Sequence, residues 1–305
     1  MHRREITRRQ FIARTAAVAG GILLSPAAAR IGWSGPKKTA VDQVPLGKTG
    51  LKLSRLGIGC GTNSGRVQQE LGQEGFTRLV RYAYDQGITY IDIARSYRTH
   101  GMLGEAIKGL PREKLFIQTK MGGVPEKPLE EIDNYRKTYG VDYIDSLLIH
   151  CTITPNWDEE RKRVMDALQE AKEKKLIRAH GVSCHSLPAL ARSAELDWVD
   201  VQLVRFNPQG ALMDTPDAKS WNAESNVSHV APVMEQVKRM HEKGRGVIGM
   251  KIIGEGRFTK PEDREKSIRF AMQSDLLDAV TIGFKSTAEI DEAIQRINAA
   301  LASVA

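Results

Sequence analysis

Four residues whose side chains can hold or move protons follow short apolar segments of the sequence. Asp92, Lys120 and His150 each end such a segment, and Tyr97 follows Asp92 five residues later. A tyrosine hydroxyl, with a pKa of about 10, is a weak acid at neutral pH, and a nearby lysine ammonium lowers that pKa. An aspartate beside the lysine keeps it charged, and a histidine can orient a substrate oxygen. These residue types suit reversible proton transfer to a carbonyl oxygen whose carbon receives a hydride, and the hydride requires a cofactor because no side chain supplies one.

The segments that must position these residues alternate between two kinds of pattern. Short β-branched segments predict buried parallel strands over 55–60, 88–92, 115–120, 143–150, 177–183, 199–204, 246–251 and 279–283. Amphipathic segments predict helices near 68–86, 101–109, 128–139, 158–175, 187–196, 231–243, 261–274 and 286–303. Eight strands alternating with eight helices predict a (β/α)8 TIM barrel, in which ionisable groups at the C-terminal ends of strands are typical of catalysis.

Two further segments complete the predicted architecture. The apolar arms 44–46 and 51–53 flank a glycine-containing turn, which predicts an N-terminal β-hairpin that caps one end of the barrel. The longest irregular stretch, 207–229, follows the sixth strand, and on the catalytic face it would cover the substrate. A doubly wound open sheet is the alternative fold. The barrel is favoured because the first strand lacks the G-x-G-x-x-G turn that such a sheet usually carries.

The first 29 residues have the three parts of a signal peptide. A twin-arginine pattern at Arg8-Arg9 precedes an apolar run over 15–24 and the small-residue site Ala27-Ala28-Ala29. We predict a Tat signal peptide over 1–29, recognition by the Tat export machinery and a periplasmic location. A short interfacial anchor is the alternative. No stable membrane span is expected, because the apolar run is shorter than the roughly 20 residues that a spanning helix needs.

The rest of the chain divides into a linker and one domain. Residues 30–43 contain glycine, proline and lysine and predict a solvated linker, and 44–305 form the predicted barrel domain. Residues 1–29 hold five arginines and one glutamate, so the remaining chain has a net charge of +4 rather than +8. This excess is too mild to indicate a nucleic-acid partner, and it is compatible with an anionic cofactor.

The three cysteines lack C-x-x-C spacing. Cys60, Cys151 and Cys184 therefore predict neither a disulfide framework nor a zinc or iron–sulfur site, and no metal site is predicted. Cys151 and Cys184 follow neighbouring predicted strands, which lie about 4.8 Å apart in a sheet. A disulfide between them after export is a hypothesis, and the folding of Tat substrates before export argues for reduced thiols.

The chain resembles the aldo-keto reductase family from about residue 44 to about residue 300. The matching motifs are 46–51 with Ser54, 56–59, 91–97, 103–107, 117–120, 141–145, 148–150 and 181–183. The resemblance implies that Tyr97 is the general acid, that Lys120 and Asp92 tune it, and that His150 orients the carbonyl. It also implies a small-molecule carbonyl substrate and NADPH as hydride donor, extended over the barrel mouth.

The same resemblance implies a set of cofactor contacts. At the nicotinamide end, Ser183 and Gln202 correspond to residues that bond the carboxamide, Cys184 stands where asparagine is usual, and Met250 replaces a stacking aromatic residue. At the other end, glycines near 254 would admit the pyrophosphate, and Lys285-Ser286 resembles the 2′-phosphate site or is an ordinary helix start. The predicted cofactor-binding residues are Cys60, Ser183, Cys184, Gln202, Met250, Gly254, Lys285 and Ser286. The resemblance implies NADP, and NAD is the alternative because an arginine expected a turn later is absent, with Ile290-Asp291 in its place.

These observations favour an exported NAD(P)-dependent oxidoreductase that acts on an aldehyde, ketone or sugar carbonyl, or on the corresponding alcohol. The competing interpretation is an exported nucleotide-binding sensor or partner subunit with little turnover, because reduced nicotinamide is not replenished outside the cytoplasm. A non-redox epimerase with tightly bound cofactor is a third. The intact set of four catalytic residues favours the enzyme.

Overall fold

The described part of the chain contains a closed parallel barrel. The computed structural model describes residues 37–221, 224 and 226–303. The barrel strands are hydrogen-bonded in the order β10-β3-β4-β5-β6-β7-β8-β9. Their bounds are β3 Leu56–Gly59, β4 Tyr90–Asp92, β5 Phe116–Met121, β6 Ile144–Thr152, β7 Ile177–Cys184, β8 Val201–Arg205, β9 Gly246–Met250 and β10 Ala279–Ile282. The predicted (β/α)8 barrel is confirmed, and each strand overlaps its predicted range.

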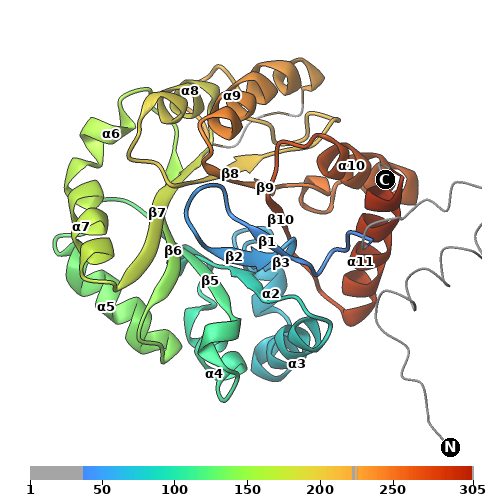
Figure 1. The fold of residues 1–305 in the computed structure, drawn as a ribbon, viewed down its shortest axis with the longest axis horizontal. Helices are drawn as coiled ribbons and strands as arrows, with labels where there is room; N and C mark the ends of the chain where they lie inside the picture. Colours follow the sequence, from blue (N-terminus) through green and yellow to red (C-terminus); the bar gives the residue numbers. More distant parts are fainter. Residues whose placement is uncertain (1–36, 222–223, 225, 304–305) are drawn as a thin grey trace, which may run out of the picture. The chain divides into compact units, whose positions relative to one another are not determined.

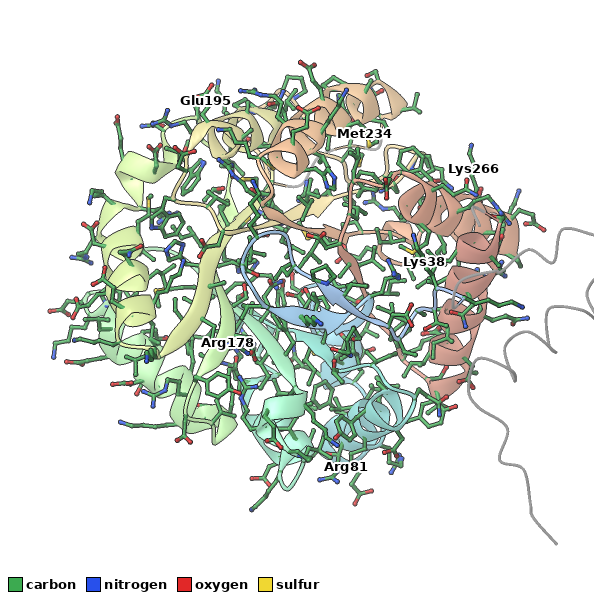
Figure 2. All side chains as sticks on the ribbon, in the orientation of Figure 1. Lys38, Arg81, Arg178, Glu195, Met234 and Lys266 are labelled. Carbon is green, nitrogen blue, oxygen red and sulfur yellow. The ribbon has the colours of Figure 1, made fainter. Side chains whose placement is uncertain are left out.

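A ring of helices covers the outside of the barrel (Figure 1). The main helices are α3 Gly72–Asp85, α4 His100–Ile107, α5 Pro128–Tyr139, α7 Lys162–Glu173, α8 Leu187–Glu195, α9 Val230–Glu242, α10 Pro261–Gln273 and α11 Thr287–Ala302. Shorter helical segments are α2 Arg66–Gln69, α6 Trp157–Glu160, η1 Arg95–Tyr97, η2 Arg112–Lys114, η3 Val227–His229 and η4 Gly254–Gly256. Polar side chains such as Glu195 and Lys266 lie on the outer surface of this ring (Figure 2).

Strand residues alternate between two apolar layers, as the period of two requires. Side chains such as Ile58 and Ile91 point outward and pack in the large cluster beneath the helices. Tyr90 and Phe116 point inward and meet edge to face with ring centroids 5.6 Å apart. The inward layer fills the barrel with packed side chains, so ligands have access only at its ends.

The predicted hairpin closes the N-terminal end of the barrel. Strands β1 (Gln43–Pro45) and β2 (Lys52–Ser54) pair antiparallel. Leu46 and Leu53 are fully buried among the inward-facing strand residues. The turn rests against the start of β9, because Lys48 N–H donates to Gly244 O at 2.7 Å. Since the hairpin seals this end, the opposite, C-terminal end remains for function.

The packed domain begins earlier than the predicted boundary at residue 44. Ala40 is fully buried, and its N–H donates to Asn298 Oδ1 in α11 at 2.7 Å. Arg55 Nε donates to Thr39 O at 3.1 Å. The last residues of the expected linker 30–43 therefore belong to the barrel domain, and their short side chains and turn explain why the sequence resembled a linker. The predicted signal peptide over 1–29 lies outside the described residues.

The long stretch 207–229 is tied to the C-terminal end of the barrel at its base. Asn207 Nδ2 donates to Ala211 O at 2.8 Å and to Lys251 O at 3.2 Å. Asn226 N–H donates to Gly210 O at 3.1 Å, which brings the two arms of the stretch together. Its described residues are therefore held on the catalytic side of the barrel.

A buried carboxylate near the opposite end ties three neighbouring strands together. Asp145 Oδ2 accepts from Ile117 N–H at 2.9 Å and from Arg112 Nη2 at 2.6 Å. Its Oδ1 accepts from Arg178 Nη1 at 2.9 Å, and Asp145 is 1% exposed. Removal of this side chain would leave a buried N–H and a partly buried cation without partners.

We predict that Asp145→Ala lowers the free energy of unfolding by about 3 kcal/mol, because the groups that donate to this carboxylate would remain buried without a partner. The matched control is Asp166→Ala, whose partner Lys162 lies on an exposed face of α7. We expect the control to change the free energy by no more than about 0.5 kcal/mol. Urea unfolding followed by circular dichroism measures both. Equal losses in the two variants would contradict a special role for the buried network.

Candidate active site

The C-terminal ends of β4, β5 and β6 bring the four predicted catalytic residues together. Asp92 ends β4, Lys120 lies near the end of β5, and His150 lies near the end of β6. Tyr97 ends η1, the short helical turn that follows β4. Because these parallel strands are neighbours in the barrel, their carboxyl ends meet at one mouth.

A buried ion pair forms the base of the site. Lys120 Nζ donates to Asp92 Oδ1 at 2.6 Å and to Ile93 O at 3.0 Å. Both side chains are buried, and Lys120 Nζ lies 5.1 Å from the centroid of the Tyr97 ring. Gln118 Nε2 donates to the same Asp92 oxygen at 2.9 Å. Sequence reasoning missed Gln118, although a polar residue two positions before Lys120 must share its inward face.

Tyr97 and His150 meet above this ion pair. The Tyr97 hydroxyl lies 3.5 Å from His150 Nε2, and the two rings meet edge to face at 5.6 Å. Ser96 Oγ lies 3.4 Å from His150 Nδ1, so each imidazole nitrogen faces a hydroxyl at the limit of hydrogen-bond distance. A Cβ on Gly61 would lie 2.6 Å from Tyr97 Cζ, so a glycine is needed there for the ring to fit.

The electrostatic surroundings keep both groups neutral. Burial raises the pKa of Tyr97 well above its usual value, and the nearby Asp92 charge raises it further. Burial lowers the pKa of His150 to about 3, with Lys120 and Lys251 adding to the effect. The pKa of Tyr97 is thus raised, not lowered as the sequence predicts, because burial and the Asp92 charge outweigh any effect of Lys120. Tyr97 therefore holds its proton at neutral pH.

The chain departs from regular strand geometry beside His150. The pairing of β6 with β7 shifts between His150 and Thr152. Cys151, between them, has a φ of 60°, a left-handed conformation that is unusual for a residue other than glycine. Bulges of this kind change the direction of neighbouring side chains and occur next to active sites.

A cleft of about 460 Å³ runs from these residues toward α10 and α11. At one end it is lined by Asp92 and Tyr97, with Met250 beside them. Its wall includes three glycines, Gly59, Gly61 and Gly283. It also includes Ile253, Glu255 and Gly256. These residues flank Gly254, whose φ of 61° suits a glycine. At the far end the lining includes Lys285, Glu289 and Glu292. Met250 and Lys285, two of the predicted cofactor-binding residues, thus line opposite ends of this cleft.

Three of the predicted cofactor residues point away from the cleft. Cys60 and Cys184 are fully buried in the layer between strands and helices. Gln202 is also fully buried, with Oε1 accepting from the Ser193 hydroxyl of α8. Each was assigned from its place in a motif, but the alternation of strand residues turns it outward. We therefore correct these three assignments.

Two serines from the same prediction differ in their contacts. Ser183 is inward-facing and fully buried, and its Oγ has no hydrogen-bond partner among the described residues. Its register partner on β6 is His150, so this hydroxyl lies near the mouth. Ser286 Oγ instead accepts from Glu289 N–H at 3.3 Å as the N-cap of α11. Ser183 therefore suits a ligand contact, whereas Ser286 acts as an ordinary helix start.

Two arginines that sequence reasoning missed lie at the far end of the cleft. Arg264 of α10 and Arg296 of α11 both line it. Glu292 Oε1 accepts from Arg264 Nε at 2.9 Å and from Arg296 Nε at 2.8 Å, which fixes the two cations beside each other. Neither arginine lies at the family position, now Ile290-Asp291, so no local motif indicated them.

The remaining chemistry is sparse in the part of the chain that the structure describes. The three cysteines are free thiols, and Cys184 Sγ accepts from Thr152 Oγ1 at 3.4 Å. The structure thus gives no support to a Cys151–Cys184 disulfide. Over the described residues, no cluster of three or more potential ligands is arranged to hold a metal ion. No helix in that part is both long and apolar enough to span a membrane.

Comparisons with known proteins agree with this geometry. "Probable aldo-keto reductase 1" of Glycine max is 29% identical over 184 residues, covering 52% of this chain and 51% of the relative. The NADH-specific methylglyoxal reductase of Escherichia coli (strain K12) is 28% identical over 169 residues, covering 47% and 52%. The chain thus spans about half the length of these curated relatives.

The fold and the family follow from two further matches. The solved holo form of an aldo-keto reductase from Bacillus halodurans has a TM-score of 0.65 at 17% identity, covering 88% of this chain and 97% of that one. At this identity the likeness shows the shared barrel. The profile of the Aldo/keto reductase family matches residues 55–304. A match over most of the chain shows that it belongs to the aldo/keto reductase family.

Proposed function

We propose that this chain is an NAD(P)H-dependent oxidoreductase that reduces an aldehyde, ketone or sugar carbonyl, with Tyr97 as the general acid. The observation that carries the proposal is the neutral Tyr97 hydroxyl between His150 and the Lys120–Asp92 ion pair, at one end of a long cleft. The family membership and the reductase names of two relatives support it.

The cleft fits an extended nicotinamide dinucleotide. At the end near Tyr97, the unpartnered Ser183 hydroxyl can bond a carboxamide, and Met250 offers an apolar surface to a ring. A Cβ on Gly283 would lie 1.9 Å from Thr62 Oγ1, so a glycine is needed at this point of the wall. The bound cofactor supplies the hydride.

The protein residues handle the proton and the carbonyl oxygen. Tyr97 carries the proton that the carbonyl oxygen takes as its carbon receives the hydride, which yields the alcohol. The neutral imidazole of His150, 3.5 Å from the same hydroxyl, orients that oxygen. Because burial raises the pKa of Tyr97, the protonated form needed for reduction predominates at neutral pH.

We propose NADPH as the preferred cofactor. Lys285, Arg264 and Arg296 line the far end of the cleft, against the carboxylates Glu289 and Glu292. The Lys285 side chain is 70% exposed, and its ammonium lies 3.7 Å from Glu289, too far for a hydrogen bond, so it can turn to bond a phosphate. NADH is the alternative, because Glu292 could instead accept a hydrogen bond from a ribose hydroxyl.

We propose export by the Tat pathway to the periplasm. The support is the ordered twin-arginine pattern, apolar run and Ala27-Ala28-Ala29 site in the sequence. The remaining net charge of +4 gives no reason to expect a nucleic-acid partner.

We predict that Tyr97→Phe lowers kcat for carbonyl reduction by roughly 10²- to 10⁴-fold, because it removes the general acid. The dissociation constant for NADPH, measured by fluorescence titration, should remain within about twofold, since the ring is kept. Tyr84→Phe, on the outer helix α3, is the control and should retain full activity.

Unchanged turnover in Tyr97→Phe would contradict the assigned mechanism. A wild-type protein that binds NADPH tightly but reduces none of a panel of aldehydes, ketones and sugars would favour the sensor function instead.

Lys285→Met should weaken NADPH binding about tenfold, the loss of one charge-assisted contact, and leave NADH binding within about twofold. Lys266→Met, exposed on α10, is the control for a lost surface charge. Isothermal titration calorimetry with each nucleotide measures both constants. A wild-type protein that binds NADH more tightly than NADPH would overturn the cofactor preference.

N-terminal sequencing of protein recovered from a periplasmic fraction should begin at residue 30. Replacement of Arg8 and Arg9 by lysine should retain the unprocessed chain in the cytoplasm, because the paired arginines are the export signal. Identical distribution of both forms would refute the Tat assignment.

A further inference from the structure

Arg205 is a buried cation at the barrel mouth that the proposed reaction does not use. It ends β8, where Val201 and Leu203 point into the barrel, so the alternation places Arg205 on the same inward face. Arg205 lies at the open, C-terminal end of the barrel, but its side chain is buried, with only 2% of the residue exposed. A charge so deeply buried requires partners or a function.

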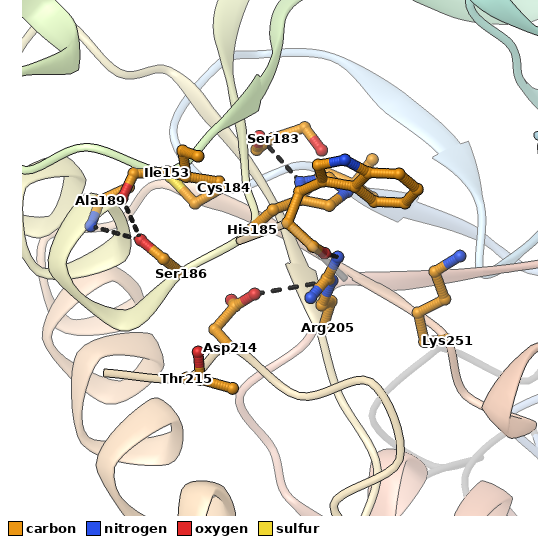
Figure 3. A network of polar contacts seen from close by, with 12 residues as sticks. Ile153, Ser183, Cys184, His185, Ser186, Ala189, Arg205, Asp214, Thr215 and Lys251 are labelled. Atoms are coloured by element: carbon orange, nitrogen blue, oxygen red, sulfur yellow. Dashed lines mark hydrogen bonds and ion pairs between the residues drawn. The ribbon is translucent and has the colours of Figure 1, made fainter. Parts of the chain in front are cut away.

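The hydrogen-bond donors of Arg205 are largely unused. Nη2 donates to Trp221 O at 2.5 Å. Nε lies 3.6 Å from Asp214 Oδ1, which is too long for a hydrogen bond, and neither Nε nor Nη1 has a hydrogen-bond partner among the described residues. Figure 3 shows the Asp214 carboxylate directed toward the guanidinium across this gap.

Asp214 does not complete the pairing either. It is fully buried, and neither carboxylate oxygen has a hydrogen-bond partner among the described residues. Burial raises the pKa of Asp214, and the Arg205 charge partly opposes this effect. The pairing of the two groups is therefore weaker than a hydrogen-bonded ion pair.

One residue lies between the guanidinium and the reacting groups. His185 separates the two, since its ring lies 6.2 Å from the His150 ring and its pKa is lowered by burial and then by the charge of Arg205. Arg205 is also paired in register with Met250, which lines the cleft beside Tyr97. Lys251 adds a second cation on this side, but it is bonded to Glu255 at 2.7 Å.

A guanidinium whose Nε and Nη1 lack hydrogen-bond partners among the described residues can bind a planar carboxylate through parallel hydrogen bonds. We propose that Arg205 forms an anion subsite of the substrate pocket, and that the substrate is a carbonyl compound that also bears a carboxylate. This inference rests on the proposed function, because it assigns the substrate class of the same mouth. The competing interpretation is that Arg205 and Asp214 only anchor the stretch 207–229.

The kinetic test compares each of two aldehyde acids, 4-oxobutanoate and 4-formylbenzoate, with its neutral methyl ester. The wild-type enzyme should favour at least one acid over its ester by about tenfold or more in kcat/KM, the effect of one charge-assisted contact. Arg205→Met should remove that preference through KM, while the ester is reduced within about threefold of the wild-type rate. No preference in the wild type, or equal slowing of acid and ester in the variant, would overturn the subsite.

Two further variants serve as a conservative substitution and a control for this test. Arg205→Lys keeps the charge but loses the planar fork, so it should restore part of the acid preference even if Arg205→Met fails to fold. An unchanged preference in Arg205→Lys would count against the subsite. Arg239→Met, exposed on α9, is the matched control and should behave as the wild type.

Equilibrium binding separates this inference from the proposed function. Benzoate and benzamide are unreactive probes, and calorimetry on the protein saturated with NADP⁺ measures their affinities without turnover. Benzoate should bind the wild type about tenfold more tightly than Arg205→Met, and benzamide should bind both equally. Selective benzoate binding in a protein that reduces no carbonyl would uphold the anion subsite and refute the reductase. Equal benzoate binding in an active enzyme would do the reverse.

Discussion

The buried ion pair between Lys120 and Asp92 is the interaction on which the site depends. Either charge alone would be unfavourable in the packed barrel by several kcal/mol, so removal of one side chain would leave the other buried without a counter-ion. At 2.6 Å, with further hydrogen bonds from Gln118 and to Ile93 O, the pair is compensated and tied to two neighbouring strands. Burial is the main cause of the raised pKa of Tyr97, and the Asp92 charge raises it further. The pair therefore acts as a rigid support for a protonated tyrosine.

Stability and chemistry are separated along the barrel axis. The hairpin and the Asp145 network stabilise the N-terminal end, where apolar side chains are packed and Asp145 is paired. At the C-terminal end, Ser183, Arg205 and Asp214 carry buried polar atoms without hydrogen-bond partners among the described residues, and the backbone departs from ordinary geometry. Cys151 and Lys251, directly beside the proposed chemistry, have φ values of 60° and 58°. Such strain persists only where the surrounding structure supports it, and it is common at functional sites.

The sequence predicts the elements better than the directions of their side chains. Strand and helix periodicity over eight repeats identified the barrel, and charged strand ends located the mouth, because both signals depend only on the order of residue types. Successive strand residues point alternately into the barrel and out toward the helices. An error of one position therefore reverses the predicted direction of a side chain. Cys184 and Gln202 were assigned from their places in a motif, which gives no direction for the side chain, and Arg205 was overlooked. Arg264 and Arg296 reach the cleft from two helices, and only tertiary packing brings them together.

The central claim is that a compensated ion pair keeps Tyr97 protonated while His150 stays neutral. The pH dependence of kcat/KM for reduction of a substrate that does not itself titrate tests it most directly. The pKa of His150 is lowered to about 3 and that of Tyr97 is raised above its usual value of 10, so neither group titrates between these limits. The account predicts a rate that is level from roughly pH 5 to pH 9. A loss of rate with an apparent pKa between 6 and 9, abolished in Tyr97→Phe or shifted in Lys120→Met, would contradict it.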